Sequence, residues 1–429
     1  MTRCRKLTQS LLAALLLVSQ AAGANEEPGA LPLNELRTFA DVFSQIRLGY
    51  VEEVDDATLL EYAIQGMLSG LDPHSVYLTA DDFEDLQSST SGEFSGLGLE
   101  VGMENGFVKV ISPIDDTPAA KAGIESGDII IKLDNQPVKG MTLNEAIEIM
   151  RGPKGSKIEM TIAREGRQPF DLTLERDIIR TASVRERWLE PGYAYVRIAQ
   201  FQRRTGDDVA KALTTLREEE ELKGIVLDLR NNPGGVLRAS VDVADQFLDG
   251  GTVVYTEGRL DNSQTRYNAT PQDKTDGVPV VVLINGGSAS ASEIVAGALQ
   301  DHRRAVVMGT PSFGKGSVQT ILPLSEERAI KLTTALYFTP NGRSIQAQGI
   351  VPDIEVERAR ITAIDNLPRR ISERDLSGRL DNANGEEEEV VERRRVPNEL
   401  LTRDNQLYEA LTLLKGIHIL GMYDAEAAH

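Results

Sequence analysis

The sequence has little of what disulfide frameworks and metal sites are built from. Its 429 residues include a single cysteine, Cys4, and four histidines. One cysteine cannot form an intramolecular disulfide, so the fold must rest on its apolar core; hydrophobic residues make up 41% of the chain. The histidines do not recur at metal-ligand spacing, and no HExxH pattern occurs. We therefore expect neither a metal nor any other cofactor.

The sequence also lacks an apolar run long enough to cross a bilayer. The run Leu11–Val18 follows three basic residues and precedes Ala22-Gly23-Ala24, a pattern typical of a cleavable signal peptide over residues 1–24. Its removal takes away three positive charges and no negative one, so the formal net charge of −20 becomes −23. An exported, disulfide-free protein is expected in the bacterial periplasm. Its acidity disfavours nucleic acid as a partner.

Residues 25–92 are predicted to form an N-terminal helical region. Apolar side chains recur there at steps of three and four residues, which predicts two amphipathic helices. The first stripe is Leu36, Phe39, Phe43, Ile46 and Tyr50, and the second is Leu60, Ile64, Met67, Leu68 and Leu71. We expect both helices to pack on the core of their own chain, and contact with the same helices of another subunit is the alternative.

Residues 358–398 are rich in charge and poor in apolar side chains, as expected of a flexible linker. Residues 399–429 then form a helical element with an apolar stripe, Leu407, Ala410, Leu411 and Leu414. This stripe could cover its own core, an adaptor or another subunit. We favour another subunit, and therefore expect a homo-oligomer.

Residues 93–170 show a change to short alternating strands and resemble a PDZ domain. The resemblance rests on the GLGL loop, on PAAKAGIESGDIIIKLDNQPV and on the helix TLNEAIEIMRG. In that family the loop holds a peptide's C-terminal carboxylate on backbone N–H groups, and the peptide adds as a strand. The resemblance gives this role to Leu97, Gly98 and Leu99, with Ile147 facing an apolar last residue.

A strand–helix–strand unit follows later in the chain. Val278–Ile284 is a β-branched run typical of a buried strand, a helix is predicted from Ser290 to about Arg303, and Ala305–Met308 is a second strand. Such crossovers are parallel and right-handed, so Ser290 and Lys315 should both lie at the C-terminal edge of the sheet. A serine at a helix N-terminus has N–H donors beside it, and a desolvated lysine can act as a base.

A third strand end carries Gly234-Gly235, after the predicted strand Gly224–Leu229. Three strand ends with this chemistry on one sheet edge predict an active site. Ser288 and Ser292 compete with Ser290 for the role of nucleophile by residue type alone. Ser288 could instead cap the helix.

Two other interpretations of this region fail on physical grounds. In the first, His302 would be the base of a Ser-His pair. It would, however, lie at the far end of the helix from Ser290, roughly 18 Å away at 1.5 Å per residue. Gly309–Lys315 fits the first seven positions of a phosphate-binding loop, but Gly316 lacks the hydroxyl that the eighth position needs and a strand follows instead of a helix.

The whole pattern resembles the C-terminal processing peptidases, a family of Ser/Lys proteases with an inserted PDZ domain. The resemblance covers about residues 31–357 and rests on the PDZ segment and five motifs: LDPHSVYLT, LDLRNNPGG, SASASEIVAGALQD, GTPSFGKGSVQ and TPNGRSIQAQGIVPDI. It implies that Ser290 is the nucleophile, Lys315 the base and Gln319 the residue that orients the lysine. Alternation along a strand would put the last two on one face.

The same resemblance assigns the oxyanion hole to the N–H of Ala291 and to that of Gly234 or Gly235, a choice that remains open. It also implies the fold class, an α/β multidomain protein. A ClpP- or crotonase-like α/β peptidase core, residues 171–357, would carry an inserted α+β PDZ domain and helical N- and C-terminal extensions.

The function expected from these residues is that of a periplasmic serine endopeptidase that selects protein substrates by an apolar, free C-terminus and is gated by its PDZ domain. The resemblance further suggests cell-wall hydrolases as substrates and a lipoprotein adaptor as a partner. Two other classes are weighed: a catalytically silent PDZ scaffold, against which Ser290 and Lys315 argue, and a crotonase-like acyl-transfer enzyme, which would not need a PDZ domain.

Overall fold

The computed structural model describes residues 31–114, 116–259, 264–360, 373, 376–377, 380 and 399–427. The signal peptide predicted for residues 1–24 and most of the linker predicted for residues 358–398 lie outside these ranges. The described chain divides into two units, of which the first ends at Leu71 and the second begins at Asp72. No helix in these ranges is long and apolar enough to cross a membrane.

The first unit consists of the two predicted helices, α2 (Leu33–Gly49) and α3 (Asp56–Ser69). Asp55 caps α3, because its Oδ1 atom accepts hydrogen bonds from the N–H groups of Ala57 and Thr58, both at 3.0 Å. No side chain of α2 is buried, and α3 buries only Leu68. Both helices are confirmed, and their packing on the core stays a prediction.

The second unit begins with strand β1 (Val76–Leu78) and with helix α4 (Ala80–Ser91), which the apolar periodicity did not reveal. The helix buries no side chain, so its sequence carries only a weak apolar stripe. Its start is nevertheless encoded by Thr79 and Asp82, which form a capping box.

A five-stranded antiparallel sheet, to which a short sixth strand adds, makes up the segment that resembles a PDZ domain. Its strands in spatial order are β3 (Leu99–Glu104), β4 (Phe107–Pro113), β5 (Ile129–Leu133), β7 (Lys157–Ala163) and β8 (Phe170–Glu175), with β6 (Gln136–Pro137) on β5. Helices α5 (Pro118–Lys121) and α6 (Leu143–Met150) cover a separate apolar core.

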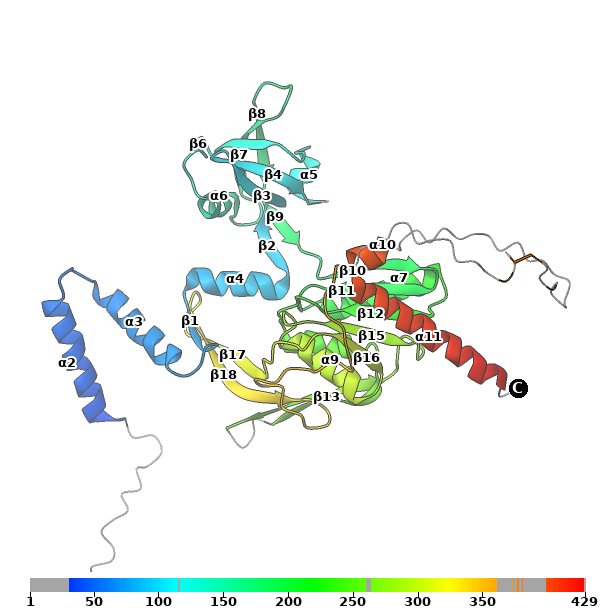
Figure 1. The fold of residues 1–429 in the computed structure, drawn as a ribbon. Helices are drawn as coiled ribbons and strands as arrows, with labels where there is room; N and C mark the ends of the chain where they lie inside the picture. The colour runs from blue at the N-terminus through cyan, green and yellow to red at the C-terminus, as the bar shows by residue number, and fades with distance from the viewer. Residues whose placement is uncertain are drawn as a thin grey trace, which may run out of the picture. The chain divides into compact units, whose positions relative to one another are not determined.

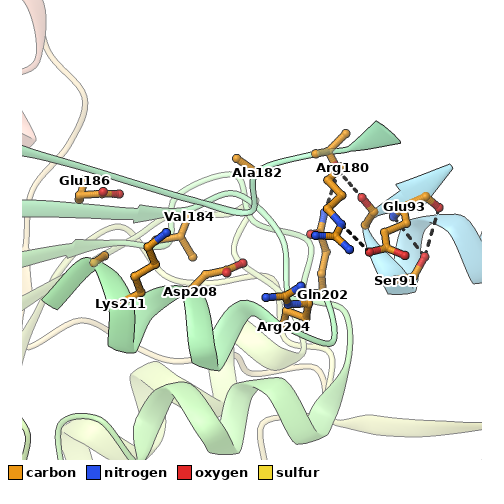
Figure 2. A pocket seen from close by; sticks show the side chains of 13 residues that line it. Ser91, Glu93, Arg180, Ala182, Val184, Glu186, Gln202, Arg204, Asp208 and Lys211 are labelled. Carbon is orange, nitrogen blue, oxygen red and sulfur yellow. Dashed lines mark hydrogen bonds and ion pairs between the residues drawn. The ribbon is translucent and has the colours of Figure 1, made fainter. Parts of the chain in front are cut away.

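Two connecting strands, β2 (Glu93–Gly96) and β9 (Asp177–Arg180), join this domain to the rest of the chain and pair with each other. Figure 2 shows the Arg180 side chain pointing toward Glu93, and the two form an ion pair at 2.8 Å. A hollow of about 350 Å³ lies beside these strands.

The remaining chain is built on a six-stranded sheet, parallel except for its first pair. Its order is β10 (Val184–Glu190), β11 (Tyr193–Ile198), β12 (Gly224–Asp228), β15 (Val280–Ile284), β16 (Ala305–Gly309) and β19 (Ile354–Glu355). The predicted strand–helix–strand unit is confirmed, since β15 and β16 pair in parallel around helix α9 (Ala291–Asp301).

Successive side chains of these strands point to opposite faces and form two apolar cores. One core includes Leu227 and Val282 and is covered by α7 (Thr205–Glu219), α8 (Leu237–Ala244) and α9. The other includes Val226 and Val281 and is covered by α11 (Asn405–Ala427), which follows the short helix α10 (Glu399–Arg403) (Figure 1).

The C-terminal stripe is therefore docked on its own chain. The four residues expected to contact another subunit are buried against this sheet instead: Leu407, Ala410, Leu411 and Leu414. That expectation was wrong, because an amphipathic pattern shows which face is apolar but not what covers it. Arg230 adds polar contacts here. Its side chain donates to Asp228, which is fully buried, and to Asp404, each at 2.7 Å.

A second sheet is antiparallel and lies beside the first. It contains β1, β13 (Asp249–Gly258), β14 (Thr265–Pro271), β17 (Ser317–Pro323) and β18 (Ala329–Phe338). Strand β17 follows β16 after a turn and pairs with β18, which in turn pairs with β1. Residues from the N-terminal motif LDPHSVYLT thereby reach β18, which pairs with the strand that carries Gln319.

Candidate active site

Ser290 stands at the N-cap of α9, directly at the C-terminal edge of the parallel sheet. Its backbone has φ of 55° and ψ of −112°, a conformation that a residue with a side chain rarely adopts. Strain of this kind costs roughly 1–3 kcal/mol and persists only where surrounding contacts impose it. Ser290 is half-buried, so its hydroxyl is within reach of a substrate.

The two competing serines have structural duties. Ser288 is fully buried, and its hydroxyl donates to the Leu229 carbonyl at 2.8 Å instead of capping the helix. Ser292 is also fully buried and donates to the Asn232 carbonyl at 2.9 Å. Both hydroxyls therefore join the α9 turn to the loop after β12. This leaves Ser290 as the one serine of the three with an accessible side chain.

The loop after β12 brings Gly234 and Gly235 to the Ser290 turn. A Cβ atom on Gly234 would lie 2.8 Å from the Cβ of Ser290 and 3.0 Å from the Ala291 nitrogen. Gly235 has φ of 141°, and a Cβ there would meet the Phe201 carbonyl oxygen at 2.1 Å, so only glycine fits. The predicted convergence of these strand ends is confirmed.

The hydrogen bonds also narrow the choice of oxyanion donor. The N–H of Gly234 donates to the side-chain oxygen of the buried Asn232 at 2.9 Å. In the described part of the chain, the N–H groups of Gly235 and Ala291 have no acceptor. An oxyanion needs donors that are not already engaged. The structure thus favours Gly235 over Gly234 as the partner of Ala291.

Glu293 is the residue that sequence reasoning missed. Its side chain is fully buried, and one carboxylate oxygen, Oε2, accepts the backbone N–H of Ser290 at 2.7 Å and that of Lys315 at 2.9 Å. The other oxygen accepts the Ser312 hydroxyl at 2.6 Å and the Gly314 N–H at 2.7 Å. The available signal was the S-x-x-E spacing of a capping box from Ser290.

This arrangement joins the nucleophile turn to the lysine loop, although Ser290 and Lys315 are 25 residues apart in sequence. Burial raises the pKa of Glu293, and the four hydrogen bonds oppose that shift. All four partners are donors, so they match an ionised carboxylate, which only accepts.

The environment of Lys315 favours the neutral amine. Desolvation lowers the pKa of its side chain, and the charge of Lys331 lowers it further, while Asp72 and Glu293 oppose the shift. Phe313, two residues before the lysine, does not supply the desolvation, because it is 63% exposed. Lys315 is half-buried, Glu293 joins its backbone to that of Ser290, and a neutral amine can accept a proton from a hydroxyl.

Gln319 lies on β17, but simple alternation along that strand does not put it on one face with Lys315, as we expected. Lys315 precedes the strand, and a bulge between Val318 and Gln319 shifts the register, so that alternation argument was wrong. The side-chain nitrogen of Gln319 donates to the hydroxyls of Ser317 at 2.9 Å and Thr333 at 3.3 Å.

The structure also bears on the two rejected interpretations. His302 is the C-cap of α9, at the opposite end from Ser290, and its ring bonds the Thr252 carbonyl at 2.7 Å. The segment after Gly309 continues into strand β17, whereas a phosphate-binding loop opens into a helix. In the described ranges no group of three or more His, Cys, Asp or Glu could hold a metal ion.

A second candidate site lies in the domain of residues 93–170. A groove of about 230 Å³ lies between β3 and α6, and Leu97, Gly98, Leu99 and Ile147 all line it as predicted. The N–H groups of Leu97 and Gly98 have no acceptor within the described chain, so they are free to bind a carboxylate. The sequence did not single out the other apolar lining residues, Phe94, Val101 and Met150.

Family models match three parts of the chain. Residues 192–356 match the model of peptidase family S41, residues 109–164 that of the PDZ domain, and residues 9–82 that of the activating protease CtpB N-terminal domain.

Two relatives and one solved structure illustrate the similarity. The chain is 48% identical to the carboxy-terminal-processing protease of Bartonella bacilliformis over 410 residues, which cover 95% of this chain and 94% of the relative. It is 40% identical to the carboxyl-terminal-processing protease of Synechocystis sp., with 70% of this chain and 71% of the relative covered. The solved photosystem II D1 C-terminal processing protease is 32% identical, with a TM-score of 0.45 and 76% of this chain and 87% of that chain covered.

The Glu293 arrangement predicts the behaviour of Glu293→Gln. An amide nitrogen cannot accept hydrogen bonds, so at least one backbone N–H of the site would be left unsatisfied, at a cost of about 1–3 kcal/mol. If the loss of such a bond displaces Ser290 or Lys315, kcat should fall by about 10–100-fold. Steady-state kinetics on a peptide substrate would measure it.

The matched control is Glu326→Gln, in an exposed turn before β18. It should leave both kcat and the melting temperature unchanged. A Glu293→Gln enzyme with wild-type kcat would show that the carboxylate does not hold the site together.

Proposed function

Because the chain belongs to the carboxy-terminal processing proteases of peptidase family S41, we propose that Ser290 is its nucleophile and Lys315 its general base. The protein is a serine peptidase with a PDZ domain. The observation that carries the assignment is the Oε2 atom of Glu293, which bonds the backbone of both residues and so holds an accessible serine and a desolvated lysine together.

The proposed reaction uses these groups in two steps. Ser290 Oγ attacks the substrate carbonyl while its proton passes to the neutral Lys315 amine, and the N–H groups of Ala291 and Gly235 stabilise the oxyanion. As the C–N bond breaks, the lysine ammonium returns the proton to the departing amine. Water then attacks the acyl ester, with Lys315 again as the base, and releases the second product. No cofactor enters either step.

We propose that the PDZ groove selects the substrate. Its free N–H groups at Leu97 and Gly98 suit a terminal carboxylate, and the apolar lining, which includes Ile147, suits an apolar last residue. The substrate class is therefore proteins with a free, apolar C-terminus. Cell-wall hydrolases within that class, and a lipoprotein adaptor, have only the family resemblance in their support.

Gating by the PDZ domain is supported by a short chain of contacts at its connecting strands. The Gln202 side chain donates to the Thr181 hydroxyl at 3.0 Å, and the Thr181 N–H donates to the Gly92 carbonyl at 3.0 Å. The neighbouring Phe201 exchanges backbone hydrogen bonds with the oxyanion loop, to Gly234 at 2.9 Å and from Val236 at 2.8 Å.

A movement of the connecting strands would thus act on residues next to the oxyanion donors. Gly92 has φ of 72°, and a Cβ there would overlap the Gln202 side chain, so the two fit only with glycine. The hollow in Figure 2, where Gln202 faces the Arg180 side chain, gives the strands space in which to shift.

A periplasmic location is part of the proposal and has the predicted leader of residues 1–24 in its support, as cell fractionation can check. A homo-oligomer is also proposed, because α2 exposes apolar side chains that include Leu36 and Phe39, at 46% and 45%.

Recognition of the C-terminus predicts a difference between free and amidated substrates. An unfolded substrate ending in an apolar residue should be cleaved with a KM at least about tenfold lower than its C-terminal amide, at similar kcat, since only the carboxylate contact is lost. Ser290→Ala should cleave neither, as mass spectrometry would show. Equal KM values for acid and amide would remove the PDZ groove from substrate selection.

Gating predicts that a non-cleavable, apolar-ended peptide stimulates cleavage of a short substrate without such a tail. In Gln202→Ala the stimulation factor should approach one, because the bond between this residue and Thr181 is gone. Arg238→Ala, an exposed change on α8, is the control and should respond like the wild type. Unchanged stimulation in Gln202→Ala would contradict the proposed route.

A further inference from the structure

The orientation of the Gln319 amide is set by a chain of hydrogen bonds that begins at the motif LDPHSVYLT. Gln319 and Thr333 face each other on the paired strands β17 and β18. The amide nitrogen of Gln319 lies 3.3 Å from the Thr333 hydroxyl, which lies 3.1 Å from Oδ1 of Asp72. The oxygen and nitrogen ends of a glutamine amide are chemically distinct but similar in shape, so the direction of these bonds decides which end faces which way.

Asp72 fixes the direction of the first bond. Its carboxylate accepts the Ser75 hydroxyl at 2.6 Å and the N–H groups of His74 and Ser75 at 2.8 and 3.0 Å. These bonds, with that from the Ser75 hydroxyl foremost, lower the pKa of Asp72. The ionised carboxylate is an acceptor only, so the single proton of the Thr333 hydroxyl must point to it.

The second bond follows from the first. Because the Thr333 proton is committed to Asp72, the Thr333 oxygen can only accept from Gln319, and the NH₂ end of the amide must face Thr333. The Oε1 end then faces away, and among the described residues it receives no hydrogen bond. Lys315 lies two residues before Ser317, whose hydroxyl accepts from the same amide nitrogen at 2.9 Å, and the charge of Asp72 opposes the lowering of the Lys315 pKa.

We propose that Asp72 and Thr333 are positioning residues that hold the Gln319 amide with Oε1, and not NH₂, toward the Lys315 amine. The inference rests on the proposed Ser290 and Lys315 pair. An oxygen in this place accepts an N–H of the amine and leaves the nitrogen lone pair free for the Ser290 proton. A flipped amide would donate into that same lone pair and block the base.

The test compares Thr333→Val with Thr333→Ser. Valine keeps the β-branched shape that suits a strand but lacks the hydroxyl. The amide then keeps only its bond to the Ser317 hydroxyl, which can donate as well as accept, so the amide can flip. We expect kcat to fall about tenfold with KM unchanged. A donor facing the neutral amine stabilises it, so the Lys315 pKa falls and the acid limb of the kcat profile should move to lower pH. Thr333→Ser should restore both.

Thr334→Val is the matched control, because Thr334 is the next residue on β18 and its hydroxyl bonds that of Thr320 instead. It should keep the wild-type kcat and acid limb. Asp72→Ala tests the chain from its other end: without the carboxylate the Thr333 proton is free to point to Gln319, so kcat should fall in the same way.

Three results would overturn the inference. The first is a Thr333→Val enzyme with the wild-type kcat. The second is a Thr333→Val enzyme that loses activity only because its melting temperature is lower, with an unmoved acid limb. The third is a Gln319→Ala enzyme with full kcat. Gln319→Ala separates this failure from that of the proposed mechanism. If Gln319→Ala loses kcat and Thr333→Val does not, only the role of Asp72 and Thr333 is wrong; if Gln319→Ala keeps full kcat, Gln319 does not orient the lysine at all.

Discussion

One oxygen atom of a buried side chain, Oε2 of Glu293, accepts the backbone N–H groups of Ser290 and Lys315. A buried carboxylate needs donors around it, and here the donors belong to the two halves of the site. The charge therefore cannot be satisfied unless the α9 turn and the lysine loop come together. The strained backbone of Ser290 persists under this constraint, because its N–H is one of the four bonds that Glu293 receives.

The same logic holds for the neighbouring loops. The buried hydroxyls of Ser288 and Ser292 bind carbonyl groups of the loop after β12, which holds Gly234 against the turn of Ser290 and Ala291. Thr333 of β18 donates to Asp72 and accepts from Gln319 of the neighbouring strand. Each catalytic group is thus held by a polar contact from another part of the chain, as preorganised sites require.

Much of this could be predicted from the sequence. The buried strand Val280–Ile284, the helix after Ser290 and the strand Ala305–Gly309 follow from hydrophobic periodicity, and the parallel crossover then places Ser290 and Lys315 on one edge. Periodicity works here because these elements are buried in two continuous cores.

Other features depend on contacts that a linear pattern does not encode. The choice between Ser288, Ser290 and Ser292 follows from which hydroxyls bind carbonyls, and that between Gly234 and Gly235 from the Asn232 side chain. The bulge before Gln319 defeated a simple alternation argument. The docking of Leu411 and its neighbours on their own sheet could not be predicted, because amphipathicity does not specify the surface that covers it.

The most direct test of the central claim is to label the enzyme with a fluorophosphonate, which reacts with an activated serine hydroxyl, and to locate the adduct by mass spectrometry. The account predicts one adduct on Ser290, no adduct in Ser290→Ala, and much slower labelling in Lys315→Ala. An adduct on Ser288 or Ser292, or undiminished labelling of Ser290→Ala, would contradict it.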